Sequence, residues 1–205
     1  MGALLQNFRN TVVVSLILAL VMISGYAAYN EQMDQRFWEA VARWLHVVFG
    51  ILWIGLLYYF NFVQIRKMPD IPAELKPAIS KHIAPEALFW FRWAALFTLL
   101  AGLALALTKG HDYTMEVLSL GMAGGYMPES DPLYALLGAG VWLAIVMFLN
   151  VWVFIWPNQK IALGIVEADA DRKAKAAKTA MLFSRTNMLL SLPMLVSMTM
   201  SQTLY

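Results

Sequence analysis

Residues 37–63, FWEAVARWLHVVFGILWIGLLYYFNFV, decide the fold class of this chain. After Arg43 the stretch runs to Val63 without another Asp, Glu, Lys or Arg. About 20 apolar residues in a helix cross the ~30 Å hydrocarbon core of a bilayer. The apolar residues are continuous rather than alternating, which is not the pattern of a membrane β-strand. We therefore predict that this stretch is a transmembrane helix.

Four further stretches are similarly long and apolar. Two of them, the third and the fifth predicted spans, each follow a charged connection. The five predicted spans are Thr11–Tyr29, Phe37–Val63, Ala87–Lys109, Leu133–Trp156 and Thr179–Met200. The 205-residue chain is 60% hydrophobic and 14% charged, whereas an average globular chain is roughly 25% charged. The sequence therefore predicts an all-α polytopic membrane protein, with about five transmembrane helices in a single membrane domain over residues 1–205.

Basic residues predict the orientation of these spans. They gather in two connections, at Arg66, Lys67, Lys76 and Lys81 and at Lys160, Arg172, Lys173, Lys175 and Lys178. Both connections lie on one side of a five-span protein, and Lys and Arg favour the cytoplasmic side. We predict a cytoplasmic N-terminus. The formal net charge of +2 gives no reason to expect a nucleic-acid partner.

A polar stripe lies near the N-terminal end of the second predicted span. Glu39, Arg43 and His46 are spaced by four and three residues, which places them on one helical face. His46 lies roughly 14 Å of helix rise beyond Phe37, at 1.5 Å per residue. Because polar groups inside a membrane are costly, the stripe is a candidate functional site.

Two interpretations of this stripe are open. A neutral imidazole can ligate haem iron, and an arginine one turn away can pair with a propionate, so His46 and Arg43 are candidate residues for binding haem b. Zero cysteines exclude covalent haem attachment and thiolate metal sites within this sequence. In the alternative, His46 bonds a neighbouring helix, while Glu39 and Arg43 form an interfacial ion pair.

The other two histidines differ in position. His111 follows the third predicted span on the side of His46, so it is the feasible second iron ligand; otherwise it is an exposed loop histidine. His82 lies in the connection on the opposite side. Methionine is common in the chain, but no single Met stands out as a ligand.

A second polar layer is predicted in the cytoplasmic half, formed by Asn61, Gln64, Asn150, Arg185 and Asn187. These side chains suit either a cofactor or quinone headgroup, or hydrogen bonds between helices. Apart from Glu39, no Asp or Glu lies within a predicted span. Proton-driven transporters generally need buried carboxylates, so this absence argues against a transporter.

One run of the second span carries a family resemblance. Arg43-Trp44-Leu45-His46-Val47-Val48 continues through Gly50–Gly55 and Tyr58–Gln64. This run resembles the membrane domain of the cytochrome c-linked urate oxidases (the urate oxidase N-terminal family). The third-span run from Trp90 to Gly102 adds to the likeness, and the rest of the chain is similar only loosely.

The resemblance implies a multi-pass protein of the bacterial inner membrane with His46 as a haem ligand. It further implies that a small substrate is oxidised and that electrons leave through a cytochrome c. Those oxidases carry a C-terminal cytochrome c domain, whereas this chain ends at Tyr205 without a cysteine. A separate cytochrome c or a larger membrane complex is therefore the expected partner.

Two functions follow as expectations. The first is an electron-transfer or oxidase component of the membrane that holds haem b near the outer face through His46, with His111 as a possible second ligand. The second is a cofactor-free accessory subunit that packs against a larger respiratory or photosynthetic complex. The few histidines, and the many aromatic and Met residues suited to helix packing, favour the second.

Overall fold

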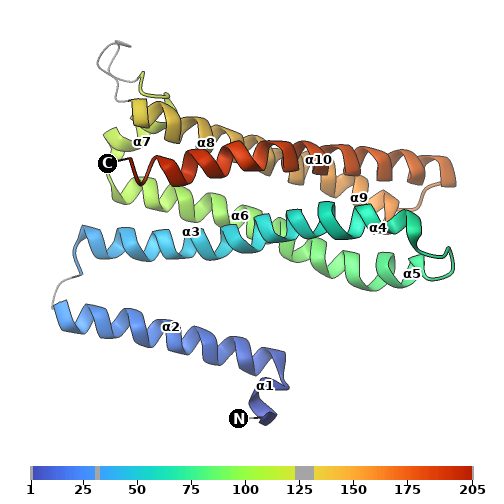
Figure 1. The fold of residues 1–205 in the computed structure, drawn as a ribbon, viewed down its shortest axis with the longest axis horizontal. Helices are drawn as coiled ribbons and strands as arrows, with labels where there is room; N and C mark the ends of the chain where they lie inside the picture. Colours follow the sequence, from blue (N-terminus) through green and yellow to red (C-terminus); the bar gives the residue numbers. More distant parts are fainter. Residues whose placement is uncertain (1, 31–32, 123–131, 205) are drawn as a thin grey trace.

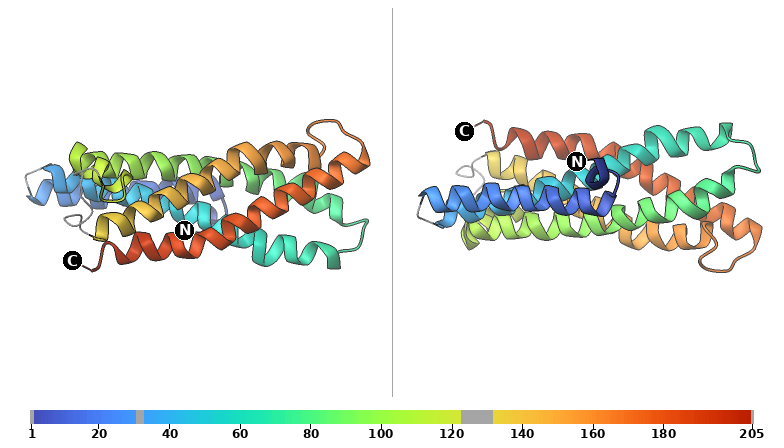
Figure 2. Two further views of the ribbon diagram at one scale, coloured as in Figure 1. Left: turned by 90° about the horizontal axis from the view of Figure 1, so that it is seen from above. Right: turned by 90° about the horizontal axis from the view of Figure 1, so that it is seen from below.

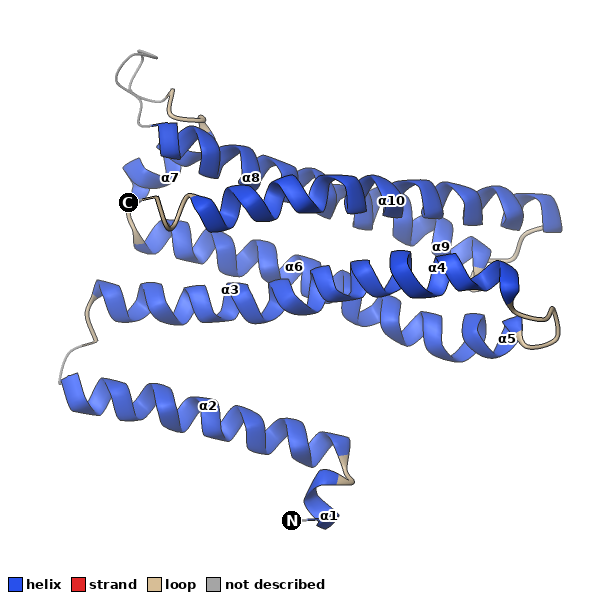
Figure 3. Ribbon diagram, in the orientation of Figure 1, coloured by secondary structure: helices blue, strands red, loops and turns tan. Residues whose placement is uncertain are grey.

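A computed structural model describes residues 2–30, 33–122 and 132–204, and these residues are almost entirely helical (Figure 3). The helices are α1 (Gly2–Leu5), α2 (Phe8–Asn30), α3 (Gln35–Tyr58), α4 (Ile65–Lys67), α5 (Lys76–Ala78), α6 (Ala84–Thr108), α7 (His111–Leu118), α8 (Pro132–Leu149), α9 (Trp156–Ala162) and α10 (Ala170–Met200). The π-helical stretches η1 (Tyr59–Gln64), η3 (Ile79–Ile83) and η4 (Asn150–Ile155) and the 3-10 turn η2 (Met68–Asp70) join some of them. The all-α prediction is confirmed for the described residues.

Four long rods form a bundle (Figures 1 and 2). They are α3 with its continuation to η2, α5 with α6, α8 with α9, and α10. Helix α3 packs along α6, and α10 packs along α8 and α9. We call the end that holds the start of α3, the end of α6 and the end of α10 the C-terminal end. The opposite end, where both lysine-rich connections lie, is the basic end.

Helix α2 lies outside this bundle, on the side of α3 (Figure 1). None of its most apolar 18-residue window is buried. Its C-terminal part approaches the bundle where the Tyr26 and Phe37 rings stack at 6.5 Å between centroids. A helix whose apolar window is left unburied by its own chain presents that surface to lipid or to another protein.

Local signals in the sequence begin and end the rods. The side chain of Asp34 accepts a hydrogen bond from the Phe37 amide at 3.0 Å, and Asp169 caps α10 in the same way through the Arg172 amide at 2.7 Å. Gly110 has φ of +112°, a conformation that a residue with a Cβ rarely adopts. It separates α6 from α7 and turns α7 across the C-terminal end.

Small residues on α6 allow α3 to approach closely. Ala94, Ala95 and Thr98 of α6 are buried, and Trp53 and Leu57 of α3 are almost completely enclosed. Trp53, Leu57 and the alanines belong to one apolar core that continues through Met147 and Val151 of the third rod to Met194 of α10; its other members are Ile54, Phe60, Leu88, Phe91 and Ile155. Small residues are typical of interfaces where close packing holds helices together.

The structure changes the predicted number of spans. All five predicted ranges lie on long helices, but only four helices of the described chain are long and apolar enough to cross a membrane: Phe8–Tyr29, Gln35–Asp70, Lys76–Thr108 and Pro132–Ala162. The fifth predicted range, Thr179–Met200, lies within α10. Ser184, Asn187, Ser191 and Ser197 are buried on its bundle face, and their polarity lowers its overall hydropathy.

Gly140 provides a test of the α8–α10 packing. A Cβ at this position would lie 2.8 Å from the Ser197 Cβ and 3.4 Å from the Met194 carbonyl oxygen. We expect Gly140→Ala to lower the unfolding temperature in detergent, at a cost of about 1–3 kcal/mol, because overpacking forces the helices apart. The matched control is Gly55→Ala, since nothing lies within 4 Å of a Cβ there. Equal unfolding temperatures of the two variants would contradict this packing.

Candidate functional site

His46 lies between α3 and α6 and bonds the main chain of the neighbouring helix. Its Nδ1 is 2.8 Å from the Thr98 carbonyl oxygen. The ring contacts Gly102, where a Cβ would come within 2.9 Å of Cε1 and Nδ1. The hydrogen bond to a neighbouring helix, which was the alternative interpretation of His46, is therefore confirmed.

This bond also fixes the form of the imidazole. A carbonyl only accepts, so Nδ1 carries the proton and the lone pair of the neutral ring is on Nε2. Within the described chain Nε2 has no hydrogen-bond partner and is not among the enclosed polar atoms. An imidazole whose other ring nitrogen donates to a backbone carbonyl is the usual form of a metal-ligating histidine. His46 therefore has the tautomer of a metal-ligating histidine.

His111 is placed differently. It is the first residue of α7, exposed, and lies beyond Gly110 at the end of α6. His46 contacts α6 further back, at Thr98 and Gly102. No contact joins the two histidines in the described residues, and no group of three or more His, Asp or Glu side chains there could hold a metal ion. His111 as a second iron ligand therefore stays a prediction.

Arg43 does not pair with Glu39. Its Nη1 donates to Gln202 Oε1 at 2.7 Å, across to the residues that follow α10. Glu39 accepts instead from Gln35 Nε2 at 3.1 Å. Among the described residues, an ion pair joins Lys67 to Asp70 and none joins Glu39 to Arg43. The ion pair of the second interpretation is therefore wrong. Arg43 is tied to the C-terminal end of the bundle.

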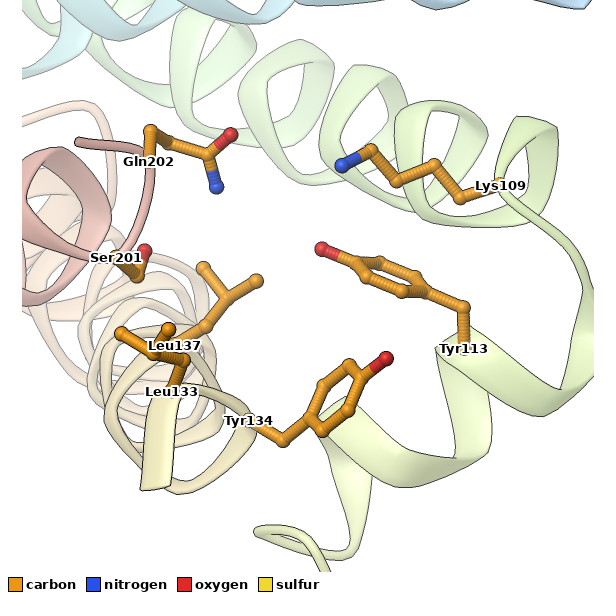
Figure 4. Close-up of a pocket in the computed structure, with 7 residues that line it drawn as sticks. All are labelled: Lys109, Tyr113, Leu133, Tyr134, Leu137, Ser201 and Gln202. Atoms are coloured by element: carbon orange, nitrogen blue, oxygen red, sulfur yellow. The ribbon is translucent and has the colours of Figure 1, made fainter. Parts of the chain in front are cut away.

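A pocket of about 300 Å³ lies beside this contact (Figure 4). We call it the C-terminal pocket. Lys109 from the end of α6, Tyr113 from α7 and Tyr134 from α8 form one side, and Ser201 and Gln202 form the other, with Leu133 and Leu137 completing the wall. Figure 4 shows the Lys109 ammonium and the Tyr113 hydroxyl pointing into the same space as the Gln202 amide.

The polar groups that face this pocket are mainly hydrogen-bond donors. Because Arg43 can only donate, it holds the Gln202 carbonyl oxygen toward itself and leaves the amide N–H groups toward the pocket. The Lys109 ammonium lies 4.8 Å from the centre of the Tyr113 ring. The Ser201 hydroxyl is buried and has no partner in the described residues. No carboxylate is among the described residues of the wall.

Tyr113 remains a donor over a wide pH range. Burial raises the pKa of its phenol, the neighbouring Tyr134 and Glu39 raise that pKa further, and Arg43 opposes them. The rings of Tyr113 and Tyr134 meet edge to face at 5.6 Å between centroids. At neutral pH the pocket therefore contains an uncharged phenol beside a charged ammonium group.

Sequence reasoning missed Tyr113, Tyr134, Ser201 and Gln202. Tyr113 lies inside the long connection 110–132 and Tyr134 lies two residues beyond it, and residues 123–131 of this connection lie outside the described chain. Their spacing gives no periodic signal that could join them to Arg43. Only the packing of α10 brings Gln202 beside α3.

The second polar layer consists of hydrogen bonds between helices. Asn150 Nδ2 donates to Asn187 Oδ1 at 2.8 Å, and Asn187 Nδ2 donates to the Met147 carbonyl at 2.9 Å. Asn61 Nδ2 donates to Ser184 Oγ at 3.0 Å. Arg185 is exposed and takes no part in this layer. The interhelical interpretation of these asparagines is therefore confirmed.

A second pocket, of about 440 Å³, opens at the basic end. Its wall is mainly apolar, with Phe60, Leu88 and Met181 among its residues. Gln64 and Lys76 add polar groups, and the Gln64 Oε1 is buried without a hydrogen-bond partner in the described chain. Gln64 belongs to η1, and π-helical stretches are frequent at functional sites.

No family model matches the chain, and no curated protein or solved structure shows significant similarity to it.

The buried asparagine pair predicts a measurable coupling. We expect Asn150→Leu and Asn187→Leu each to destabilise the protein by about 1–2 kcal/mol, because each leaves a buried amide without its partner. The double variant should lose less than the sum of the two, since no unpaired amide remains in the pair. Thermal unfolding in detergent measures all three, with the exposed Thr186→Ala as control. Strict additivity would show that the pair is not coupled.

Tyr113 predicts a loss of stability at alkaline pH. Its pKa is higher in the folded protein than the value of about 10 in an unfolded chain. Its contribution to stability is therefore complete below about pH 10 and is lost as pH rises through the folded value. Absorbance titration of tyrosinate should show a late component that Tyr113→Phe removes and Tyr29→Phe, at an exposed position, leaves in place. A late component that persists in Tyr113→Phe would assign it to another tyrosine.

Proposed function

We propose that this chain is an integral-membrane component of an electron-transfer or oxidase system that binds haem b through His46. The observation that carries the proposal is the tautomer of His46. Its Nδ1 donates to the Thr98 carbonyl at 2.8 Å and its Nε2 is left with a free lone pair. The resemblance of residues 43–64 to the membrane domain of the cytochrome c-linked urate oxidases supports the same function.

Several features favour a membrane location for this function. Four described helices have the length and apolarity of membrane spans, and the basic residues of both lysine-rich connections lie at one end of the bundle. Positive residues on the cytoplasmic side would orient His46 toward the outer half. The location that we propose is a bacterial inner membrane, with a cytoplasmic N-terminus and a separate cytochrome c or larger complex as partner.

The chain's own residues have simple roles in this proposal. His46 holds the iron, and the Thr98 carbonyl keeps the ring in the ligating tautomer. Gly102 leaves room for the imidazole beside α6, where any side chain would displace it. Arg43, one helical turn toward the C-terminal end, supplies positive charge for an acidic group of the haem. Bound haem b would supply one-electron transfer.

A second function is favoured by one observation, the exposure of α2. A strongly apolar helix with no buried residue in its most apolar 18-residue window presents a surface for packing against another protein. In that case the chain is an accessory subunit of a larger respiratory or photosynthetic complex. The His46 bond then serves only to hold α3 against α6.

The spectrum of the purified protein distinguishes the two functions. We expect the reduced-minus-oxidised difference spectrum, with a pyridine haemochrome assay, to show about one b-type haem per chain. His46→Ala should lose it, because the iron loses its ligand. The matched control is His82→Ala, which changes an exposed histidine at the basic end and should keep the haem. His111→Ala tests the second ligand through a change in the band shape.

The haem content of the wild-type protein can also contradict haem binding. If the folded wild-type protein contains no haem when it is purified together with its native partners, the proposal of haem binding is wrong. Co-purification with a large complex, without absorbance of its own, would then support the accessory subunit. Retention of full haem in His46→Ala would exclude His46 as the ligand.

A further inference from the structure

The C-terminal pocket has the chemistry of an anion site. Of the polar groups that face it, the Lys109 ammonium can only donate, and the phenols of Tyr113 and Tyr134 supply two O–H groups. The Gln202 amide presents its N–H groups, because its oxygen accepts from Arg43. No carboxylate from the described residues lines it. Converging donors that include a cation bind a group with negatively charged oxygen atoms.

Arg43 fixes the orientation of the Gln202 amide. Its bond to Gln202 Oε1 at 2.7 Å determines which way the Gln202 amide faces. Arg43 also lies close enough to Tyr113 to act on its phenol, as does Glu39 with the opposite sign. The described residues give neither Arg43 nor Lys109 a carboxylate partner. Of these two, Lys109 lies in the pocket wall, so its positive charge is available to a ligand there.

The dimensions and the walls restrict the ligand further. A volume of about 300 Å³ is at the lower limit of pockets that enclose small molecules. Leu133, Leu137 and the two tyrosine rings offer apolar and aromatic surface around the donors. The Ser201 hydroxyl, buried and without a partner in the described chain, lies at the wall. A small aromatic carboxylate would use both kinds of surface, whereas inorganic phosphate would use only the donors.

We propose that the C-terminal pocket binds a small aromatic carboxylate, with Lys109, Tyr113 and Gln202 as its donors. This inference is independent of haem ligation, because none of these donors contacts His46. A small molecule of this class would be recognised at the C-terminal end of the bundle.

The test uses benzoate and benzamide as matched probes. They have nearly the same shape, but only benzoate is charged at neutral pH. Binding to the full chain in detergent is measured by isothermal titration calorimetry. We expect benzoate to bind with millimolar or better affinity and benzamide to bind at least about tenfold more weakly, as the loss of a charge-assisted hydrogen bond implies. Phosphate should also bind more weakly than benzoate.

Variants then locate the site. Gln202→Glu keeps an acceptor for Arg43 but places a carboxylate where the amide donor was, so it should abolish benzoate binding while the protein stays folded. Lys109→Gln should weaken binding about tenfold, and Tyr113→Phe should weaken it less. Lys81→Gln, an exposed lysine at the basic end, should change nothing. His46→Ala should bind benzoate as the wild type does, which separates this site from the haem.

Three results would overturn the proposal. The first is equal affinity for benzoate and benzamide, which removes the role of charge. The second is unchanged benzoate binding in both Lys109→Gln and Gln202→Glu. The third is no binding of benzoate at millimolar concentration to a wild-type protein whose thermal unfolding shows that it is folded.

Discussion

The close approach of α3 to α6 is the constraint on which both ends of the molecule depend. Ala94, Ala95 and Thr98 are small and buried on α6, so along this stretch the residues of α3 can come close to its main chain. His46 can bond the Thr98 carbonyl only because Gly102 has no Cβ. The same approach carries Arg43 to the end of the bundle where α10 terminates. A bulkier α6 would separate the helices and change both sites together.

The helical rods could be predicted from the sequence because continuous apolar runs leave few alternatives. The helix breaks follow from equally local signals, as at Asp34 and Gly110. Long stretches that seemed to be connections are also helical: α7 lies in the connection 110–132, and α10 begins at Ala170, before the predicted fifth span. Helix-favouring residues before the predicted span make α10 longer than that span. Its buried serines and Asn187 make it more polar than the other spans.

The candidate site was predicted only in part, for a physical reason. Helical periodicity correctly placed Glu39, Arg43 and His46 near one another on α3, but it does not specify what each side chain meets. Arg43 meets Gln202 and His46 meets Thr98, residues far away in the sequence. The tyrosines of the C-terminal pocket come from two other helices. Periodicity is also interrupted at η1 and η4, where wider π turns change the face that later residues present. Such contacts depend on how whole helices pack.

The rods differ in length, and this matters in a bilayer. Phe8–Tyr29 on α2 spans 22 residues, about 33 Å of rise, which matches a hydrocarbon core of ~30 Å. Gln35–Asp70 spans 36 residues, about 54 Å, and the usual range of tilt, up to about 40°, is too small to absorb that mismatch. If α2 sets the depth of the protein, the basic end projects as a rigid stalk beyond the lipid headgroups. Its lysines and arginines would then face the aqueous phase, where salt and soluble acidic proteins compete for them.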